Sequence, residues 1–504
     1  MNIAKNKLDG FNRLIFPLFF LSICWLLYKD NFHFYPFFHH AWAQTDRYAL
    51  ALGFYENGMN LFLPTSYNLE TTGGITAADL ALSEYLAAIF MQISGWQTPQ
   101  VLKISNLLFA FTAYCFLYKW VYNQTNSIIK SIFACIFFAT LPIFVYYQSG
   151  FSPSLNAFFV WLISLCYYLN YLENNRVKNL YLSVFLACLA ALIRKPFILF
   201  LAGMALYQFI ANILAKRYFY KPFYLSFGLS FCLFIIFYLY NDYISQKYGT
   251  RFLNKFMPAT NWLEFKELSA HIFYKWGFKY AEIFHYLSLF TLFILQFILF
   301  KWDNFSKKII LHLFIFLSVG IAYFVLMTKQ FVHHEYYFVD SFMPFIALLF
   351  ILFCYNLKYI HNSKFSQFIN LILICFSALL VKKAVANQLE NYKINPQDMY
   401  YQVYNNFEGA DKFLDSLNIP KQATFLVIDA YSTNSPLIQL RRKGFCNLTT
   451  SEKEIKKDME RFKYDYIIVQ NNLYKEGVLD NYPQFALLVD TVATNGKISI
   501  LRGK

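Results

Sequence analysis

Apolar stretches of about twenty residues recur along most of this chain, separated by short polar connections. Each is long enough to cross a hydrocarbon core of about 30 Å as a helix. Helices are expected because lipid offers the backbone no hydrogen-bond partners. The pattern predicts eleven such spans, at about 14–29, 101–121, 130–148, 153–172, 178–193, 196–214, 222–241, 281–300, 308–327, 336–357 and 365–381. The first connection, about 30–100, and a later one, about 242–280, are much longer than the others.

The pattern changes after about residue 384. Strand-like runs at 424–428 and 466–469 flank a turn through Asn434 and Pro436 and a charged amphipathic segment at 451–462. Alternating strand and helix patterns predict a small α/β domain. We therefore expect a transmembrane domain over 1–383, including the loop at about 30–100, and an extramembrane domain over 384–504. Acceptor recognition or simple stability is the role predicted for the polar turn of the tail.

Composition supports lipid as the main solvent, with 58% hydrophobic, 21% aromatic and only 14% charged residues. The net charge of +15 does not indicate a nucleic-acid partner, because the cations occupy short loops and form no aromatic-interleaved stripe. Cations of alternate loops fall on the side of Lys5 and Lys7, which the positive-inside rule makes cytoplasmic. They are Lys119, Lys130, Arg176, Lys178, Lys216, Arg217, Lys221, Lys301, Lys307, Lys308, Lys358 and Lys364.

An odd number of spans places the two termini on opposite sides of the membrane. The first long loop and the tail domain are thus expected on the periplasmic or extracellular face, where neither ATP nor nucleotide sugars are freely available. Chemistry on that face needs a substrate that carries its own activation.

Three carboxylates, Asp46, Asp79 and Glu84, lie in the first long loop. A loop of this length between membrane helices is uncommon unless it folds and has a function. A carboxylate under apolar cover at a membrane surface can act as a general base, because desolvation raises its pKa. The alternative is that these residues are solvated loop charges or helix caps.

Two further clusters carry chemistry. The segment Lys329–Tyr337 contains His334, Glu335, Tyr336 and Tyr337 just before a span with Pro344. It can bind a metal or a phosphate, or anchor the helix at the interface. His334 and Glu335 are the candidate ligands for a divalent ion.

The other cluster is the basic pair Arg194-Lys195 before Pro196, on the outer face. Cations there oppose the positive-inside bias, so a lipid phosphate is a natural partner. Snorkelling of both side chains to lipid headgroups is the alternative.

Several of these motifs resemble GT-C-fold membrane glycosyltransferases, in particular the group of protein O-mannosyltransferases and lipid A aminoarabinose transferases. The resemblance rests on the aromatic first helix, Asp46-Arg47-Tyr48 after Trp42 and Gln44, the stretch from Asn60 to Pro64, and Gly74-Ile-Thr76. It covers roughly residues 10–360, and the tail more faintly.

The resemblance implies roles for individual residues. It makes Asp46 the catalytic base and Asp79 the second acidic residue, with Glu84 as the next candidate. It places Tyr336 and Tyr337 in the donor site and favours Lys195 over Arg194 as the ligand of the donor phosphate, with Arg47 as an additional cation.

The expected activity is sugar transfer from a polyprenyl-phosphate donor to a protein, lipid or glycan acceptor, at the outer face of a bacterial inner membrane. A transporter or flippase of lipid-linked glycans is one alternative, but such proteins usually carry charges near the midplane and related halves or broken helices. A glycan polymerase is another, for which we expect the large loop late in the chain, whereas here it comes first.

Overall fold

The computed structural model describes residues 2–250, 252, 255–360 and 362–504, with the side chains from residue 15 onward. It divides into two compact units. We call them the helical unit (Met1–Phe32, Asn106–Leu239 and Leu253–Glu390) and the mixed unit (His33–Ser105, Tyr240–Phe252 and Asn391–Lys504). The mixed unit thus joins the first long loop to the tail. Lys5, Lys7 and Arg13 precede the described side chains.

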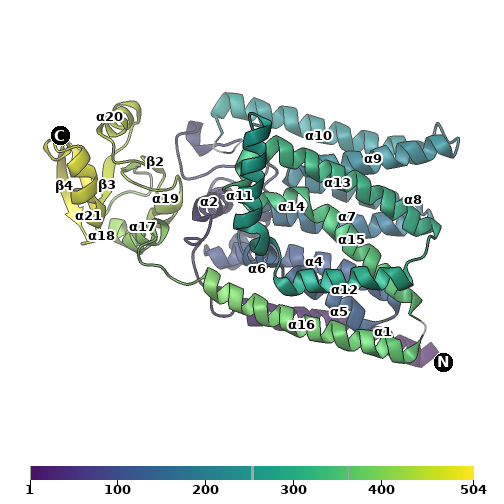
Figure 1. Ribbon diagram of the computed structural model, residues 1–504. Coiled ribbons are helices and arrows are strands. Elements are labelled where there is room, and N and C mark those ends of the chain that lie inside the picture. Colours follow the sequence, from purple (N-terminus) through teal and green to yellow (C-terminus); the bar gives the residue numbers. More distant parts are fainter. Residues whose placement is uncertain (1, 251, 253–254, 361) are drawn as a thin grey trace. The chain divides into compact units, whose positions relative to one another are not determined.

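Most of the long helices in the helical unit run alongside one another, while α11 lies across them (Figure 1). The helices that lie in it wholly or in large part are α1 (Asn2–Tyr28), α4 (Pro99–Thr125), α5 (Ile128–Ala139), α6 (Pro142–Tyr147), α7 (Pro153–Asn174), α8 (Val177–Ile193), α9 (Phe197–Leu214), α10 (Lys221–Tyr248), α11 (Trp262–Tyr280), α12 (Ile283–Leu299), α13 (Asn304–Phe331), α14 (Tyr337–Ser341), α15 (Met343–Asn356) and α16 (Ser363–Asn391).

Six of the described helices are long and apolar enough to cross a membrane: α4, α7, α9, α10, α13 and α16. The pair α11 and α12, bent by 87° between them, brings the number to seven if it counts as one span. Shorter apolar helices lie at Ile15–Tyr28, Ile128–Ala139, Val177–Ile193 and Met343–Tyr359. The prediction of a multi-pass membrane protein is confirmed, while the count of eleven spans stays a prediction.

Two predicted spans and one predicted loop differ in detail. The segments 130–148 and 336–357 are each interrupted, and α6 and α15 restart with Pro142 and Pro344 in their first turns. Proline has no N–H, so the first turn of a helix is where it costs least. The connection expected at about 242–280 is largely helical, because α10 continues to Tyr248 and α11 begins at Trp262.

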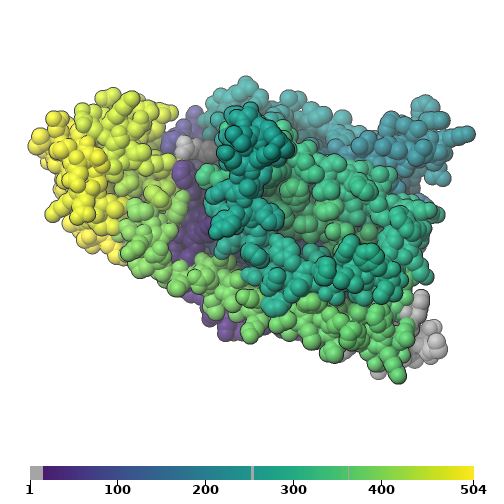
Figure 2. All heavy atoms as spheres, in the orientation of Figure 1, coloured from purple at the N-terminus to yellow at the C-terminus, as the bar shows by residue number. Residues whose placement is uncertain are grey.

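Apolar side chains cover much of the outer surface of the helical unit. Leu225, Leu229 and Ile236 of α10 are each more than half exposed, and they lie on one face of the helix. In the apolar 18-residue stretch of α10 only 22% of the residues are buried, against 83% in that of α7. Helix α11 also lies at the surface in the view of Figure 2, with Phe273 and Tyr274 strongly exposed. Such faces are stable against lipid.

The mixed unit contains a five-stranded sheet in the order β2-β1-β3-β5-β4. β1 pairs in parallel with β2 and β3, and β5 pairs antiparallel with β3 and β4. The strands are β1 (Phe425–Val427), β2 (Gly444–Cys446), β3 (Tyr466–Gln470), β4 (Val489–Thr494) and β5 (Ile498–Gly503). The helices are α2 (Ala41–Glu56), η1 (Thr72–Gly74), α3 (Leu82–Ser94), α17 (Met399–Phe407), α18 (Ala410–Ser416), α19 (Ser435–Leu440), α20 (Glu452–Arg461), α21 (Asn471–Leu473), η3 (Tyr474–Leu479) and α22 (Phe485–Leu488).

The α/β tail is therefore confirmed, including both predicted strands and the amphipathic helix, now α20. The predicted turn through Asn434 and Pro436 is wrong beyond Asn434, because Ser435–Leu440 forms α19 with Pro436 in its first turn. Proline fixes φ near the helical value, which favours a helix start at this point.

The first long loop packs on the edge of this sheet within the mixed unit. The Leu69 N–H donates to the Gly444 carbonyl oxygen at 2.8 Å, and the Gly444 N–H donates to the Tyr67 carbonyl oxygen at 3.1 Å. A Cβ at Gly444 would lie 2.1 Å from the Phe425 carbonyl oxygen, so only glycine allows β1 and β2 to approach so closely. The loop is thus an integral part of the tail domain's structure.

Candidate functional site

Helix α2 carries the predicted base into the interior of the mixed unit. Its residues from Gln44 to Phe54 are buried, including Asp46, which is 6% exposed. A Cβ at Gly53 would lie 1.9 Å from the Thr65 carbonyl oxygen, which shows how closely α2 packs against the following coil. Asp46 therefore does not behave as a solvated loop charge, because a buried carboxylate needs hydrogen-bond donors around it.

Two such donors come from the tail. The Asn434 side-chain amide donates to Asp46 Oδ1 at 2.7 Å, and the Thr433 hydroxyl donates to the same oxygen at 3.0 Å. The Asn434 side chain is held in turn, since its Oδ1 accepts the Asn68 N–H at 3.2 Å. Both donors are buried. Hydrogen bonds to an ionised group are shorter and stronger than neutral ones, so this pair fixes the carboxylate in one orientation.

Thr433 and Asn434 are site residues that the sequence interpretation did not assign to the carboxylate. A signal was present, because they follow β1, whose two neighbours in the sheet are parallel to it. Polar residues beyond the carboxyl ends of parallel strands are a common location for sites in α/β domains. What sequence could not supply was the contact with a residue 387 positions earlier in the chain.

The second pair in the mixed unit is Arg47 with Glu84. Arg47 Nη1 lies 3.6 Å from Glu84 Oε1, and both side chains are less than 10% exposed. The Arg47 guanidinium also lies 4.8 Å from the centre of the Phe252 ring, and the Ser83 hydroxyl donates to Glu84 Oε2 at 2.8 Å. Arg47 and Glu84 therefore offset each other's charge. Asp79 is half-buried in the coil that leads to α3.

In the helical unit, Arg194 forms a buried ion pair with Asp340 of α14. Arg194 Nη2 lies 2.7 Å from Asp340 Oδ2, and Nε donates to the same oxygen at 2.8 Å. Asp340 is fully buried. The guanidinium also lies 5.3 Å from the centre of the Tyr337 ring. This contact supplies the partner that a cation between two apolar spans needs, and it comes from a carboxylate of the protein itself.

Lys195 follows directly in the turn between α8 and α9. Its ammonium lies 5.6 Å from the centre of the Tyr238 ring of α10, within the range of a cation–π contact. The side chain is partly exposed.

The segment between α13 and α14 places Glu335 in the interior of the helical unit. Glu335 is 4% exposed, and its Oε1 accepts the Tyr147 hydroxyl at 2.8 Å. The Tyr147 ring also meets Tyr336 edge-on, with ring centres 5.9 Å apart. The His334 ring lies 5.3 Å from that of Tyr336. The predicted cluster is therefore a packed aromatic group around one buried carboxylate.

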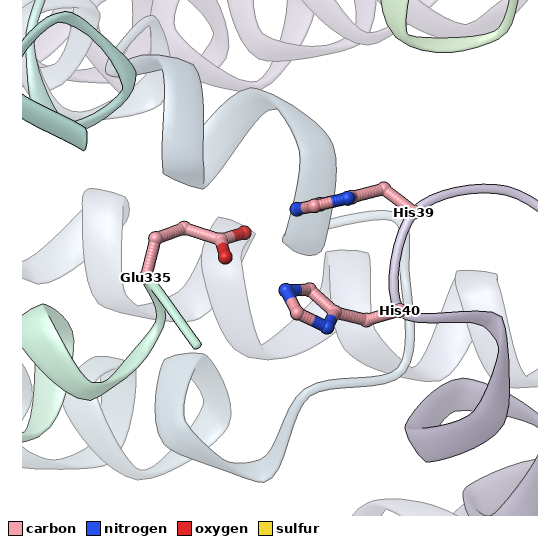
Figure 3. Close-up of side chains that lie close together, drawn as sticks. All are labelled: His39, His40 and Glu335. Carbon is pink, nitrogen blue, oxygen red and sulfur yellow. The ribbon is translucent and has the colours of Figure 1, made fainter. Parts of the chain in front are cut away.

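Two further histidines belong to the residue types that bind divalent ions. Figure 3 shows His39 and His40 on the loop that precedes α2, together with Glu335 on the segment before α14. The two imidazole rings have their centres 4.1 Å apart. His40 has a left-handed backbone conformation, with φ of 53°. Imidazole and carboxylate groups suit zinc and similar ions. The sequence shows the His-His pair, but its adjacency alone did not mark it as a ligand pair.

Comparisons with known proteins agree on the fold. Residues 81–240 match the family model described as dolichyl-phosphate-mannose-protein mannosyltransferase. The whole chain is similar to the crystal structure of ArnT from Cupriavidus metallidurans in the apo state, with a TM-score of 0.55 and 10% identity over 98% of each chain. The structure of that protein bound to undecaprenyl phosphate gives a TM-score of 0.51 at 10% identity over 97% of each chain.

A third similar structure is the oligosaccharyltransferase from Archaeoglobus fulgidus in the apo form. The TM-score is 0.51 at 11% identity, over 92% of this chain and 70% of that one. Among curated protein sequences, none matches this chain significantly.

Proposed function

Because the chain has the fold of GT-C membrane glycosyltransferases, we propose that it transfers a sugar from a polyprenyl-phosphate-linked donor to an acceptor hydroxyl. The observation that carries the proposal is the burial of Asp46, with two donors of the tail on one carboxylate oxygen. A carboxylate held in this way has a fixed orientation in which to accept the proton of the acceptor hydroxyl. The undecaprenyl phosphate bound by the similar ArnT structure supports a lipid phosphate as the carrier.

The proposed reaction is a single displacement. The acceptor oxygen attacks the anomeric carbon while Asp46 accepts its proton. The bond between the sugar and the phosphate breaks, and the electron pair leaves with the polyprenyl phosphate. One displacement inverts the configuration at the anomeric carbon. General-base assistance of this kind contributes about 10²- to 10⁴-fold to a rate.

Lys195 is the cation that we propose for the leaving phosphate. Positive charge where negative charge develops stabilises a transition state. Arg194 and Arg47, which pair with Asp340 and Glu84, were predicted for the same role, and we propose them as supporting cations. We keep Tyr336 and Tyr337 as donor-site residues, and Asp79 and Glu84 as secondary acids, with Glu84 holding Arg47 in place.

For a divalent ion, we propose His334 and Glu335 as ligands in the helical unit. Such an ion would supply positive charge for the departing phosphate. We further propose eleven spans in a bacterial inner membrane, with the N-terminus in the cytoplasm and the tail domain in the periplasm, where the acceptor is a glycan, a lipid or a protein.

The test uses the full chain purified in detergent. It is incubated with a panel of polyprenyl-phosphate sugars and acceptors, and released polyprenyl phosphate is measured. Asp46→Asn should lower the rate at least 100-fold without changing thermal stability by more than a few degrees. Asp480→Asn, which changes an exposed carboxylate of the same domain, is the matched control. Full activity of the Asp46 variant would refute the base assignment, and an intact sugar-phosphate bond with every donor would favour a transporter.

Lys195→Ala tests the phosphate role separately. Loss of one charge-assisted contact should weaken donor binding by about tenfold or more. Lys178→Ala removes an exposed cation at the other end of α8 and should leave donor binding unchanged. An unaltered donor affinity in the Lys195 variant would remove this residue from the donor site.

A further inference from the structure

A polar cavity of about 710 Å³ lies in the mixed unit, at the other end of α2 from Asp46. Its walls come from the end of α2, the coil after it, α18, the segment before β1 and the segment between α19 and β2. Glu56, the last residue of α2, lies ten residues after Asp46. At a rise of 1.5 Å per residue, the helix carries the two carboxylates about 15 Å apart. The cavity is thus distinct from the proposed base.

Nearly all of the cavity's lining residues are polar or charged, with Leu69 the exception. Three cations line it, Arg441, Lys421 and Lys443, against two carboxylates, Glu56 and Asp411. The remaining lining residues are Tyr67, Gln97, Gln422 and Thr424. This mixture offers hydrogen-bond donors and acceptors side by side, with more cations than carboxylates in the lining; Lys421 also pairs with Asp415 at 2.8 Å. A ligand with many hydroxyl groups and one anionic group matches both properties, because each hydroxyl can donate and accept.

Arg441 is the residue that marks where an anionic group can bind in the cavity. Its Nη2 donates to the Gln97 carbonyl oxygen at 2.6 Å, which fixes the guanidinium. Its Nη1 forms an ion pair with Glu56, 3.8 Å from Oε1, and makes no short hydrogen bond among the described residues. This ion pair is too long for a hydrogen bond, so the guanidinium can still take a second acceptor beside Glu56. A carboxylate or phosphate oxygen is the acceptor that a guanidinium binds best.

The backbone at Arg441 supports the same interpretation. Arg441 ends α19 with φ of 53°, a left-handed conformation that favours glycine at a helix end. At this position the backbone conformation favours glycine, yet the chain has an arginine with a long charged side chain. Strained positions of this kind gather at ligand sites.

The opposite wall is held by Tyr67 and Glu56. The Tyr67 hydroxyl donates to Glu56 Oε1 at 2.5 Å. Burial, and next the Glu56 carboxylate, raise the pKa of Tyr67, so the phenol stays a neutral donor at physiological pH. Glu56 therefore remains an acceptor for ligand hydroxyls.

We propose that this cavity binds an acidic saccharide unit, with its anionic group on the guanidinium of Arg441 and its hydroxyl groups on Glu56 and the neighbouring amides. If the proposed glycosyl transfer is correct, the cavity is a remote subsite for an acidic glycan acceptor, about 15 Å from the base along α2. The saccharide binding itself does not depend on transfer. Lys421 and Lys443 lie at the same walls and add long-range attraction for the anion.

The test measures binding by isothermal titration calorimetry on the purified full chain, without any donor. Three probes are compared: trigalacturonate as a carboxylate, glucose 6-phosphate as a phosphate, and maltotriose as a neutral control. One of the two anionic probes should bind at least tenfold more tightly than maltotriose, and it identifies the anion. Arg441→Gln should weaken that binding by about tenfold or more, the loss expected for one charge-assisted hydrogen bond.

Lys457→Gln is the matched control, since it removes one exposed cation of α20 that does not line the cavity. If Arg441→Gln does not fold, the double variant Lys421→Gln/Lys443→Gln decides, and it should weaken binding by at least threefold at low salt. Equal binding of anionic and neutral probes, no binding, or full affinity in the variants would overturn the proposal. Sugar transfer without saccharide binding would refute the subsite and leave the proposed activity intact. Saccharide binding without sugar transfer would refute the proposed activity and leave the subsite intact.

Discussion

Removing the side-chain amide of Asn434 should slow sugar transfer and move its pH dependence. Asn434→Ala deletes the 2.7 Å hydrogen bond to Asp46 Oδ1 and leaves the one from Thr433. The variant lies in the tail domain, 388 residues from the proposed base in sequence. An effect on transfer would therefore show that the tail completes the catalytic group.

The size of the effect follows from the charge on the acceptor. A hydrogen bond to an ionised group is worth about 1.5–3 kcal/mol. Without this bond, the acid limb of the pH–rate profile should move to higher pH. The shift is toward higher pH because the lost hydrogen bond stabilised the ionised form of the Asp46 carboxylate. At the pH plateau the rate should fall by about tenfold, because the carboxylate is no longer held in one orientation.

The assay is release of polyprenyl phosphate between pH 4 and pH 8, with thermal unfolding measured on the same samples. Asn481→Ala is the control, since it removes two hydrogen bonds of the same domain that do not involve Asp46. Thr433→Val should shift the acid limb in the same direction, and Thr433→Ser should restore it. A loss of stability with an unmoved acid limb would mean that Asn434 only supports the fold, and the reasoning would be wrong.

Three other outcomes can be checked by thermal unfolding in detergent. Asp340→Asn should destabilise the chain by about 3–5 kcal/mol, because it removes the carboxylate of a buried ion pair; a negligible shift would show that the ion pair is hydrated. Gly444→Ala should cost at least about 1–3 kcal/mol, since its Cβ would meet the Phe425 carbonyl oxygen, and an unchanged midpoint would contradict the close approach of β1 and β2. Burial raises the pKa of Asp429, so the charged form is penalised at neutral pH and the penalty disappears in acid. Asp429→Asn should therefore raise the midpoint at pH 7 and leave it unchanged near pH 3, and an equal gain at both would speak against burial as the cause.

Much of the fold could be predicted from local pattern. Each predicted apolar segment overlaps a helix, and the strand runs at 424–428 and 466–469 became β1 and β3. These features depend on residues that are close in sequence, such as β-branched runs and twenty-residue apolar stretches. The breaks at Pro142 and Pro344 were missed, because hydropathy continues across them while the backbone does not.

The candidate site divides in the same way. The sequence singled out Asp46 as a candidate base, and Arg194 and Lys195 as an unusual basic pair. The partners of Asp46 and Arg194 were not, because Thr433, Asn434 and Asp340 are too distant in sequence for spacing to reveal the contact.

The sequence by itself determined the solvent of each part of this protein, since hydrophobicity summed over twenty residues decides between lipid and water. It also determined where acids and bases stand along the chain. Only the tertiary structure decided which charges are already paired within the protein and which face a cavity. The physical reason is that pairing depends on distance in space, and a buried charge is stable only when distant segments bring it a partner.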